Sequence, residues 1–180
     1  MSKLSRKTKE TEIDVEVSLG GESRIATPVK FLDHMLGAFA KHGGFGLRVA
    51  ARSKDEDEHH LVEDVAITLG GAFRQMRETG PVKRFGHEAL PMDDALVAVY
   101  LDAGGRGYYA GKLPNVMYEH FLRSFAHEAG ITLHVDVMRG RDEHHVTEAV
   151  FKALGRALRR GLEPASEVQS TKGEAKSRGG

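Results

Sequence analysis

The 180-residue sequence contains no cysteine, which excludes disulfides, thiolate metal sites and a cysteine nucleophile. No apolar run approaches the roughly 20 residues that a membrane-spanning helix needs. The 26 basic and 26 acidic residues leave no net charge to attract nucleic acid or a membrane surface. The first residues lack the apolar core of a secretory signal. We therefore expect a cytoplasmic protein with no nucleic-acid or membrane partner.

Histidine, by contrast, is abundant, and four of the ten histidines lie in two nearly identical segments. "DEHHLVE" begins at Asp57, and "DEHHVTE" begins at Asp142, 85 residues later. An upstream histidine is repeated too, because "FLDHMLGAFAKHGG" aligns with "MYEHFLRSFAHEAG" and places His34 over His120. This register predicts that the chain is an internal duplication.

Periodicity predicts the same order of elements in each half: strand, strand, helix, strand, helix. Alternating apolar residues indicate strands at 11–19, 45–53, 95–103 and 131–138. Helical spacing follows in the stretches 29–44, 59–77, 115–130 and 144–160. Paired glycines, at 20–21 and 104–105, are expected to turn the first strand of each half into a hairpin.

The duplication and the element order predict an α+β fold in which each half is a ββαβα unit. We expect residues 1–79 and 93–162 to form the two halves of one compact domain, joined by a connector at 80–92. The segment 163–180 is rich in serine, lysine and glycine, and it is expected to be a flexible tail.

The repeated histidines have the spacing of metal ligands on a helix. His60 and Glu63 are three residues apart and His59 and Glu63 are four apart, so each pair shares a face. Adjacent residues point about 100° apart, so the two histidines serve two ions better than one. The full candidate set comprises His34, His59, His60, Glu63, His120, His144, His145 and Glu148. It offers four ligands to each of two ions, and we expect each half to supply its own set.

Structural explanations compete with the metal site. A lone histidine on a helix is most often an ordinary polar residue, and a helix dipole favours acidic residues in the first turn without any function. Neither explains why both halves contain a His-His pair followed by a glutamate three residues after the second histidine. Imidazole and carboxylate without sulfur suit Mn, Zn, Fe, Co or Ni. The histidines outside the pattern are read as surface or structural: His42, His87, His127 and His134.

Several motifs resemble the imidazoleglycerol-phosphate dehydratase family, whose members act in histidine biosynthesis. They run in the family's order from about Thr8 to Gly173: "FLDHM", "HG", "DEHHLVEDVAITLG", "RFG", "MDDAL", "LDAGGRGYY", "EHFLRSFAHEAGITLHV", "DEHHVTEAVFKALGRALR" and "STKG". The resemblance thus covers nearly the whole chain.

The resemblance implies two four-stranded sheets, each packed on two helices, in a ribosomal-protein-S5-domain-2-like fold. It implies two divalent ions per active site, most simply Mn2+, bound where subunits of a trimer-based 24-mer meet. The implied reaction is loss of water from D-erythro-imidazole-glycerol phosphate to give imidazole-acetol phosphate. The enzyme class is therefore a lyase, and the expected partners are a phosphorylated imidazole substrate and further copies of the chain.

The resemblance also assigns roles to residues outside the histidine clusters. Glu10 in "TKETE" matches an acid–base residue that contacts substrate, and Glu63 and Glu148 match carboxylates that take part in catalysis. The matching phosphate contacts are Arg84, Arg106, Lys152, Ser170 and Lys172, the last two on a tail that would close over the phosphate. From the sequence alone, Glu10 and the arginines would be read as solvated surface residues, and the tail as disordered.

Some positions depart from the family pattern, and two other functions fit part of the sequence. Gly37 and Ala38 replace an acid and an amide, and Gly107 stands where proline is usual; these changes bear on substrate affinity, not on the reaction class. The segment after "STKG" departs as well, and bears on closure of the tail. A metal-storing shell would need the metal ligands but not the arginine and lysine side chains that contact phosphate. A metal-dependent phosphatase would use both and release inorganic phosphate.

Overall fold

The computed structural model describes residues 1–55 and 57–167, which form two similar halves. The first half contains β1 (Ser2–Lys7), β2 (Thr11–Leu19), β3 (Arg24–Ala26), α1 (Lys30–Gly43), β4 (Phe45–Ser53) and α2 (Glu58–Arg77). The second contains β5 (Phe85–Met92), β6 (Ala95–Asp102), β7 (Tyr108–Gly111), α3 (Val116–Ala129), β8 (Thr132–Arg139) and α4 (Glu143–Gly161). No helix among the described residues is long and apolar enough to span a membrane. The predicted α+β duplication with four-stranded sheets is confirmed.

The strand order differs from the expected hairpins after the paired glycines. The sheets run β1-β2-β4-β3 and β5-β6-β8-β7, so β3 lies beside β4 and parallel to it, not beside β2. β7 and β8 are related in the same way. The hairpin prediction was wrong because helices α1 and α3 act as crossovers between parallel strands, which is the connection that parallel pairing requires.

The hairpins that do form are β1–β2 and β5–β6, and their first strands were missed. β1 is an edge strand of mostly polar residues, so it shows little apolar alternation. β5 is an edge strand of the second sheet and carries Pro91, which edge positions tolerate. Residues 85–92, expected within the connector, therefore belong to the second sheet.

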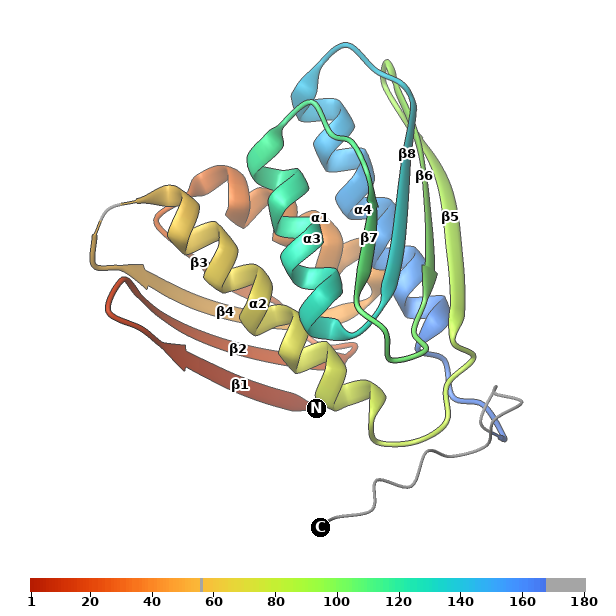
Figure 1. Ribbon diagram of the computed structural model, residues 1–180, viewed down its shortest axis with the longest axis horizontal. Helices are drawn as coiled ribbons and strands as arrows, with labels where there is room; N and C mark the ends of the chain where they lie inside the picture. Colours follow the sequence, from red (N-terminus) through yellow and green to blue (C-terminus); the bar gives the residue numbers. More distant parts are fainter. Residues whose placement is uncertain (56, 168–180) are drawn as a thin grey trace.

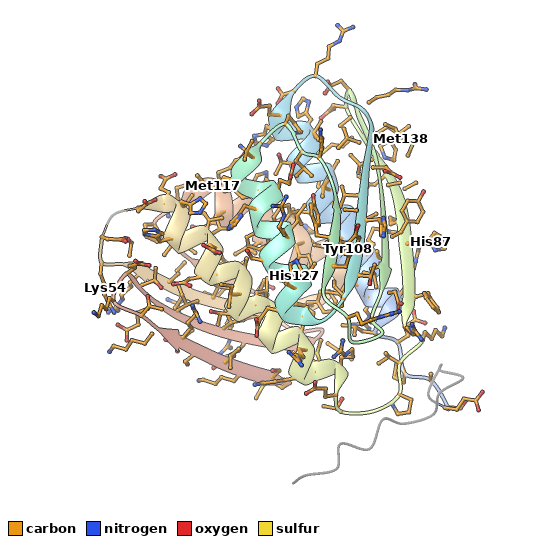
Figure 2. The ribbon with its side chains drawn as sticks, viewed as in Figure 1. Lys54, His87, Tyr108, Met117, His127 and Met138 are labelled. Carbon is orange, nitrogen blue, oxygen red and sulfur yellow. The ribbon has the colours of Figure 1, made fainter. Side chains whose placement is uncertain are left out.

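The four helices lie between the two sheets (Figure 1). The inward sides of the strands and the helices form one hydrophobic core, which includes the phenylalanines Phe39, Phe73, Phe121, Phe125 and Phe151. The outward sides are polar on the first sheet. On the second sheet, His87 and Met138 point away from the helices (Figure 2).

Helices of different halves pack directly on each other, α1 on α4 and α2 on α3. Both contacts depend on glycine. A Cβ on Gly155 of α4 would lie 2.4 Å from the Phe39 oxygen of α1, and one on Gly70 of α2 would lie 2.8 Å from the Phe125 oxygen of α3. Because Phe39 and Phe125 are equivalent in the repeat, as are the glycines, the two contacts are copies of one arrangement. This arrangement places the N-terminal turns of paired helices next to each other.

The acidic residues before the histidine pairs begin the helices. Asp57 caps α2 by accepting a hydrogen bond from the His59 N–H at 2.8 Å, and Asp142 caps α4 through the His144 N–H at 2.7 Å. Caps of this kind stabilise a helix by about 1 kcal/mol. The local sequence thus fixes where each His-His pair starts on its helix.

Candidate metal centre

Three side chains from α1 and α4 converge, and we name them the α1–α4 cluster: His34, His144 and Glu148. One carboxylate oxygen, Oε2 of Glu148, lies 3.1 Å from His34 Nε2 and 3.2 Å from His144 Nε2. Glu148 is buried, with 7% of its surface exposed, whereas both histidines are exposed. The cluster therefore opens to solvent on its imidazole side.

An equivalent group forms on α2 and α3, the α2–α3 cluster: His59, Glu63 and His120. Glu63 Oε1 lies 3.1 Å from His120 Nε2, and its Oε2 lies 3.9 Å from His59 Nε2. The two imidazole rings are 4.9 Å apart between centroids. In both clusters the possible ligand atoms lie within 4.8 Å of one another.

The ligand sets combine the two halves, which corrects the expectation that each half has its own. His34 belongs to the first half but meets His144 and Glu148 of the second, and His120 of the second half meets His59 and Glu63 of the first. The repeat establishes which positions are equivalent, but helix packing decides which of them meet. The glycine contacts described above pair α1 with α4 and α2 with α3.

The clusters fit a divalent cation. His120 Nε2 is buried and has no hydrogen-bond partner, although it faces Glu63. A buried nitrogen without a partner costs free energy unless something binds it, and a metal ion would satisfy it together with the carboxylate. Two imidazoles and a carboxylate without sulfur are the donor set of Mn, Fe, Co, Ni or Zn sites.

The remaining two predicted ligands, His60 and His145, lie outside both clusters. The ring of His60 is 6.2 Å from that of His59, and the ring of His145 is 6.1 Å from that of His144, nearly perpendicular in each pair. Each instead contacts an aspartate. These contacts raise the pKa of both histidines, mainly through the hydrogen bonds to Asp55 and Asp94.

Lys152 lies beside the α1–α4 cluster. Its ammonium is 2.8 Å from Glu148 Oε1. Burial alone raises the pKa of Glu148, but the hydrogen bonds from Lys152 and His34 outweigh it, so the pKa falls below the ordinary value. Glu148 is therefore held as an anion, as a metal ligand must be. Lys152, predicted as a phosphate contact, has this carboxylate as its partner.

Glu10 lies in the β1–β2 turn, near His60. Its carboxylate is 3.9 Å from His60 Nδ1 and half exposed. Hydrogen bonds from two other segments fix this turn. Lys54, at the end of the first sheet (Figure 2), donates to the Thr8 and Thr11 carbonyls. Buried Asp64 of α2 accepts hydrogen bonds from the hydroxyls of both threonines.

Asp64 was not predicted from the sequence, although it directly follows Glu63. It also pairs with Arg6 at 2.7 Å, so one buried carboxylate joins β1, the turn and α2. Asp64→Ala is expected to lower stability by about 2–3 kcal/mol, because it removes the carboxylate that accepts from the buried Thr11 hydroxyl and breaks a part-buried ion pair with Arg6. Thermal unfolding followed by circular dichroism measures the loss. An exposed aspartate of β8, changed as Asp136→Ala, is the control, and equal melting temperatures would contradict the anchoring role.

The two predicted phosphate-binding arginines lie near Asp102 at the end of β6. Arg84 donates its Nε and Nη2 to the Asp102 carboxylate, the latter at 2.8 Å. The hydrogen bond from Arg84 lowers the pKa of Asp102, and the charge of Arg106 adds to the effect. Arg106 is exposed. Ser170 and Lys172, the other predicted phosphate contacts, lie outside the described residues.

Arg84 and the α1–α4 cluster lie at opposite ends of α4. The Arg84 N–H donates to the Gly161 oxygen at 2.8 Å. Gly161 follows His144 by 17 residues, which corresponds to a rise of about 25 Å along a helix. A single small substrate could not contact this arginine and this cluster within one chain.

Comparison with known proteins identifies the family. The family model described as imidazoleglycerol-phosphate dehydratase matches residues 27–158. The chain belongs to the imidazoleglycerol-phosphate dehydratase family. The enzyme of that name from Pyrobaculum calidifontis is 46% identical over 95% of this chain and 98% of its own. The one from Thermoanaerobacter sp. strain X514 is 46% identical over 96% and 97%.

Solved structures of the family share the fold. The imidazoleglycerol-phosphate dehydratase of Pyrococcus furiosus, determined in complex with (S)-C348, superposes with a TM-score of 0.84 at 39% identity, covering 94% of this chain and 99% of its own. The Staphylococcus aureus enzyme gives a TM-score of 0.80 at 32% identity, covering 92% and 100%. The protein is accordingly a hydro-lyase of histidine biosynthesis, in a metal-dependent family that acts on a phosphorylated imidazole.

Proposed function

We propose that the two clusters bind two divalent ions, Mn2+ in the cell, and that His60 and His145 complete the ligand sets of neighbouring subunits. The observation that carries this proposal is that two three-ligand clusters each have a neighbouring, partly exposed histidine, His60 or His145, whose ring lies outside the cluster and nearly perpendicular to the ring inside it. Each ion would then have four protein ligands, and each would join two chains. Ions shared in this way imply a homo-oligomer, and the simplest is the trimer-based 24-mer that the family resemblance implies. We propose that it is located in the cytoplasm.

The long separation between Arg84 and the α1–α4 cluster supports an active site shared between subunits. A phosphate bound by Arg84 and Arg106 in one chain would lie near the metal ligands of another. Arginine suits this role because its planar fork binds phosphate oxygens in pairs. Lys152, Ser170 and Lys172 are proposed as further phosphate contacts.

Metal ions held by the two clusters would supply Lewis acidity and a binding site for the imidazole ring of the substrate. Side chains of the protein are proposed to carry out the proton transfer. Glu10 is proposed to transfer the proton, because its carboxylate is exposed, lies beside His60 and is carried by an anchored turn. Glu63 and Glu148 are proposed to bind the ions of their clusters and in this way to take part in catalysis.

Incubating the manganese-loaded protein with imidazole glycerol phosphate tests the proposed reaction and metal together. We expect imidazole-acetol phosphate, detected as a ketone, with activity lost on chelation and restored by Mn2+. Light scattering on the same samples tests whether chelation also reduces the size of the assembly. Release of inorganic phosphate, or unchanged substrate, would contradict the proposed reaction.

The phosphate role of Arg84 makes a separate prediction. Arg84→Ala is expected to raise KM by about 10- to 100-fold with a smaller change in kcat, because a charge-assisted contact made throughout the reaction is worth roughly 1.5–3 kcal/mol. Steady-state kinetics measure the split. Arg48→Ala, on the outer side of the first sheet, is the matched control. A fall in kcat at unchanged KM would contradict the assignment.

A further inference from the structure

One aspartate in each half binds both the start of a helix and the outward histidine on it. In the first half, Asp55 Oδ1 accepts the N–H of Asp57, the cap of α2, at 3.2 Å. Its other oxygen lies 2.7 Å from His60 Nδ1. The carboxylate therefore fixes the ring of His60 relative to the helix that carries it.

The second half contains the same device. Asp94 Oδ2 accepts the N–H groups of Arg141 and of Asp142, the cap of α4, at 2.6 and 3.2 Å. Its Oδ1 lies 2.8 Å from His145 Nδ1. The hydrogen bonds from the Arg141 backbone, His145 and the Asp142 backbone lower the pKa of Asp94 to about 2, so the group is an anion at neutral pH.

The two aspartates do not occupy equivalent positions, so the duplication alone does not explain them. Asp55 lies in the segment between β4 and α2, where the register of the histidine pairs places Gly140 in the second half. Asp94 lies in the β5–β6 turn, where the register of the paired glycines places Glu10 in the first half. The same contact has thus been built twice from different parts of the fold.

The equivalent carboxylates Asp94 and Glu10 differ in their distance from the outward histidine of their half. Asp94 is within hydrogen-bond distance of His145, whereas its counterpart Glu10 stops 3.9 Å short of His60. Asp55 occupies the place on His60 that Glu10 would otherwise take. The Glu10 carboxylate is therefore close to the His60 ring but not hydrogen-bonded to it, and it is about half exposed.

We propose that Asp55 and Asp94 are positioning residues that fix the ring orientation of His60 and His145 and reserve Nε2 of each for a metal ion. This inference rests on the proposed function, because it takes both histidines to be ligands. A carboxylate that accepts the Nδ1 hydrogen leaves the lone pair on Nε2, and such partners commonly strengthen metal binding. About a third of each histidine side chain is exposed, at 38% and 33%. His145 Nε2 also lies 3.7 Å from the exposed carboxylate of Asp93.

Asparagine is the sharpest substitution because it keeps the shape of aspartate. An amide has one acceptor and one donor end, so it cannot accept from the helix N–H and from Nδ1–H with separate oxygens. We expect Asp55→Asn and Asp94→Asn each to weaken Mn2+ binding about 10- to 100-fold at half of the sites and to leave the other half unchanged. The double variant should weaken all sites. Asp136→Asn, on the outer side of β8, is the matched control.

The measurement is a titration with Mn2+, in which electron paramagnetic resonance detects the free ion. Because Asp55 is argued to act through His60, Asp55→Asn should have no further effect on Mn2+ affinity in a His60→Ala background. A merely structural role would add to the loss in that background. Circular dichroism of each variant confirms folding before titration.

The outcomes separate the inference from the proposed function. If the wild-type protein binds Mn2+ and both asparagine variants bind it equally well, the inference is overturned and the metal proposal stands. Weakening of every site by one single variant, or an additive effect with His60→Ala, also overturns it. Failure of the wild-type protein to bind Mn2+ would overturn the metal proposal, and the inference with it.

Discussion

His34→Ala is expected to abolish dehydration and to remove half of the bound metal. His34 supplies one of three ligands to the α1–α4 cluster, and loss of the ion would remove several kcal/mol of stabilisation from developing charge. A loss of roughly 4 kcal/mol lowers the rate about 1,000-fold. Turnover and metal content measured on the same sample test both parts. An exposed histidine of β8, changed as His134→Ala, is the control.

Double variants distinguish the observed pairing from the pairing first expected. If His34 and His144 hold one ion, the variant lacking both should retain about half of the metal, the same as either single variant. Removing His34 and His59 together should empty both clusters, although both residues belong to the first half. Half retention in the second double variant would mean that each half holds its own ion, contrary to the structure.

Gly155→Val is expected to lower stability by about 3 kcal/mol or more. A Cβ at this position would lie 2.4 Å from the backbone oxygen of Phe39 and 3.0 Å from the nitrogen of Gly43. Backbone atoms cannot move aside as the end of a side chain can, so α1 must shift away from α4. For a chain of this size, the melting temperature should fall by roughly 10 °C. Because the same shift separates His34 from His144, metal affinity should fall as well.

A glycine on α1 provides a control in which the expected change in stability has the opposite sign. Gly37 lies on α1, and a Cβ there would meet nothing within 4 Å. Gly37→Ala should therefore raise stability by about 0.5–1 kcal/mol, because alanine favours a helix over glycine. An unchanged melting temperature for Gly155→Val would show that the close contact between α1 and α4 is not required.

The four long helices and the four central strands could be predicted from periodicity because these elements bury one full face. β2, for example, alternates between buried and more exposed positions, and β6 does so except at Ala98, which is buried as well. The edge strands β1 and β5 could not be predicted in this way because few of their side chains are buried. β3 and β7 are short, and the glycines before them suggested that each would pair with the preceding strand in a hairpin. Each instead pairs in parallel with the strand that follows the next helix.

The candidate ligands were found because the sequence repeats them, but their partners were not. Equivalence between His34 and His120 is compatible with either pairing of the helices, and packing such as the close contacts at Gly70 and Gly155 selects the observed one. Asp94 lies 51 residues before His145, so no local pattern connects them. Asp102 was likewise part of a quoted motif without an assigned role, since its contact with Arg84 depends on strand pairing.

The exchange of ligands between the repeats has a consequence for how such a chain could have arisen. A protein made of one repeat would carry every ligand type but could not bring them together, because its own two helices do not form the pair that holds an ion. Two copies related by a twofold axis would complete two identical sites at once. An ancestral symmetric dimer of single repeats would account for this arrangement, and the interface of that dimer would correspond to the core of the present chain.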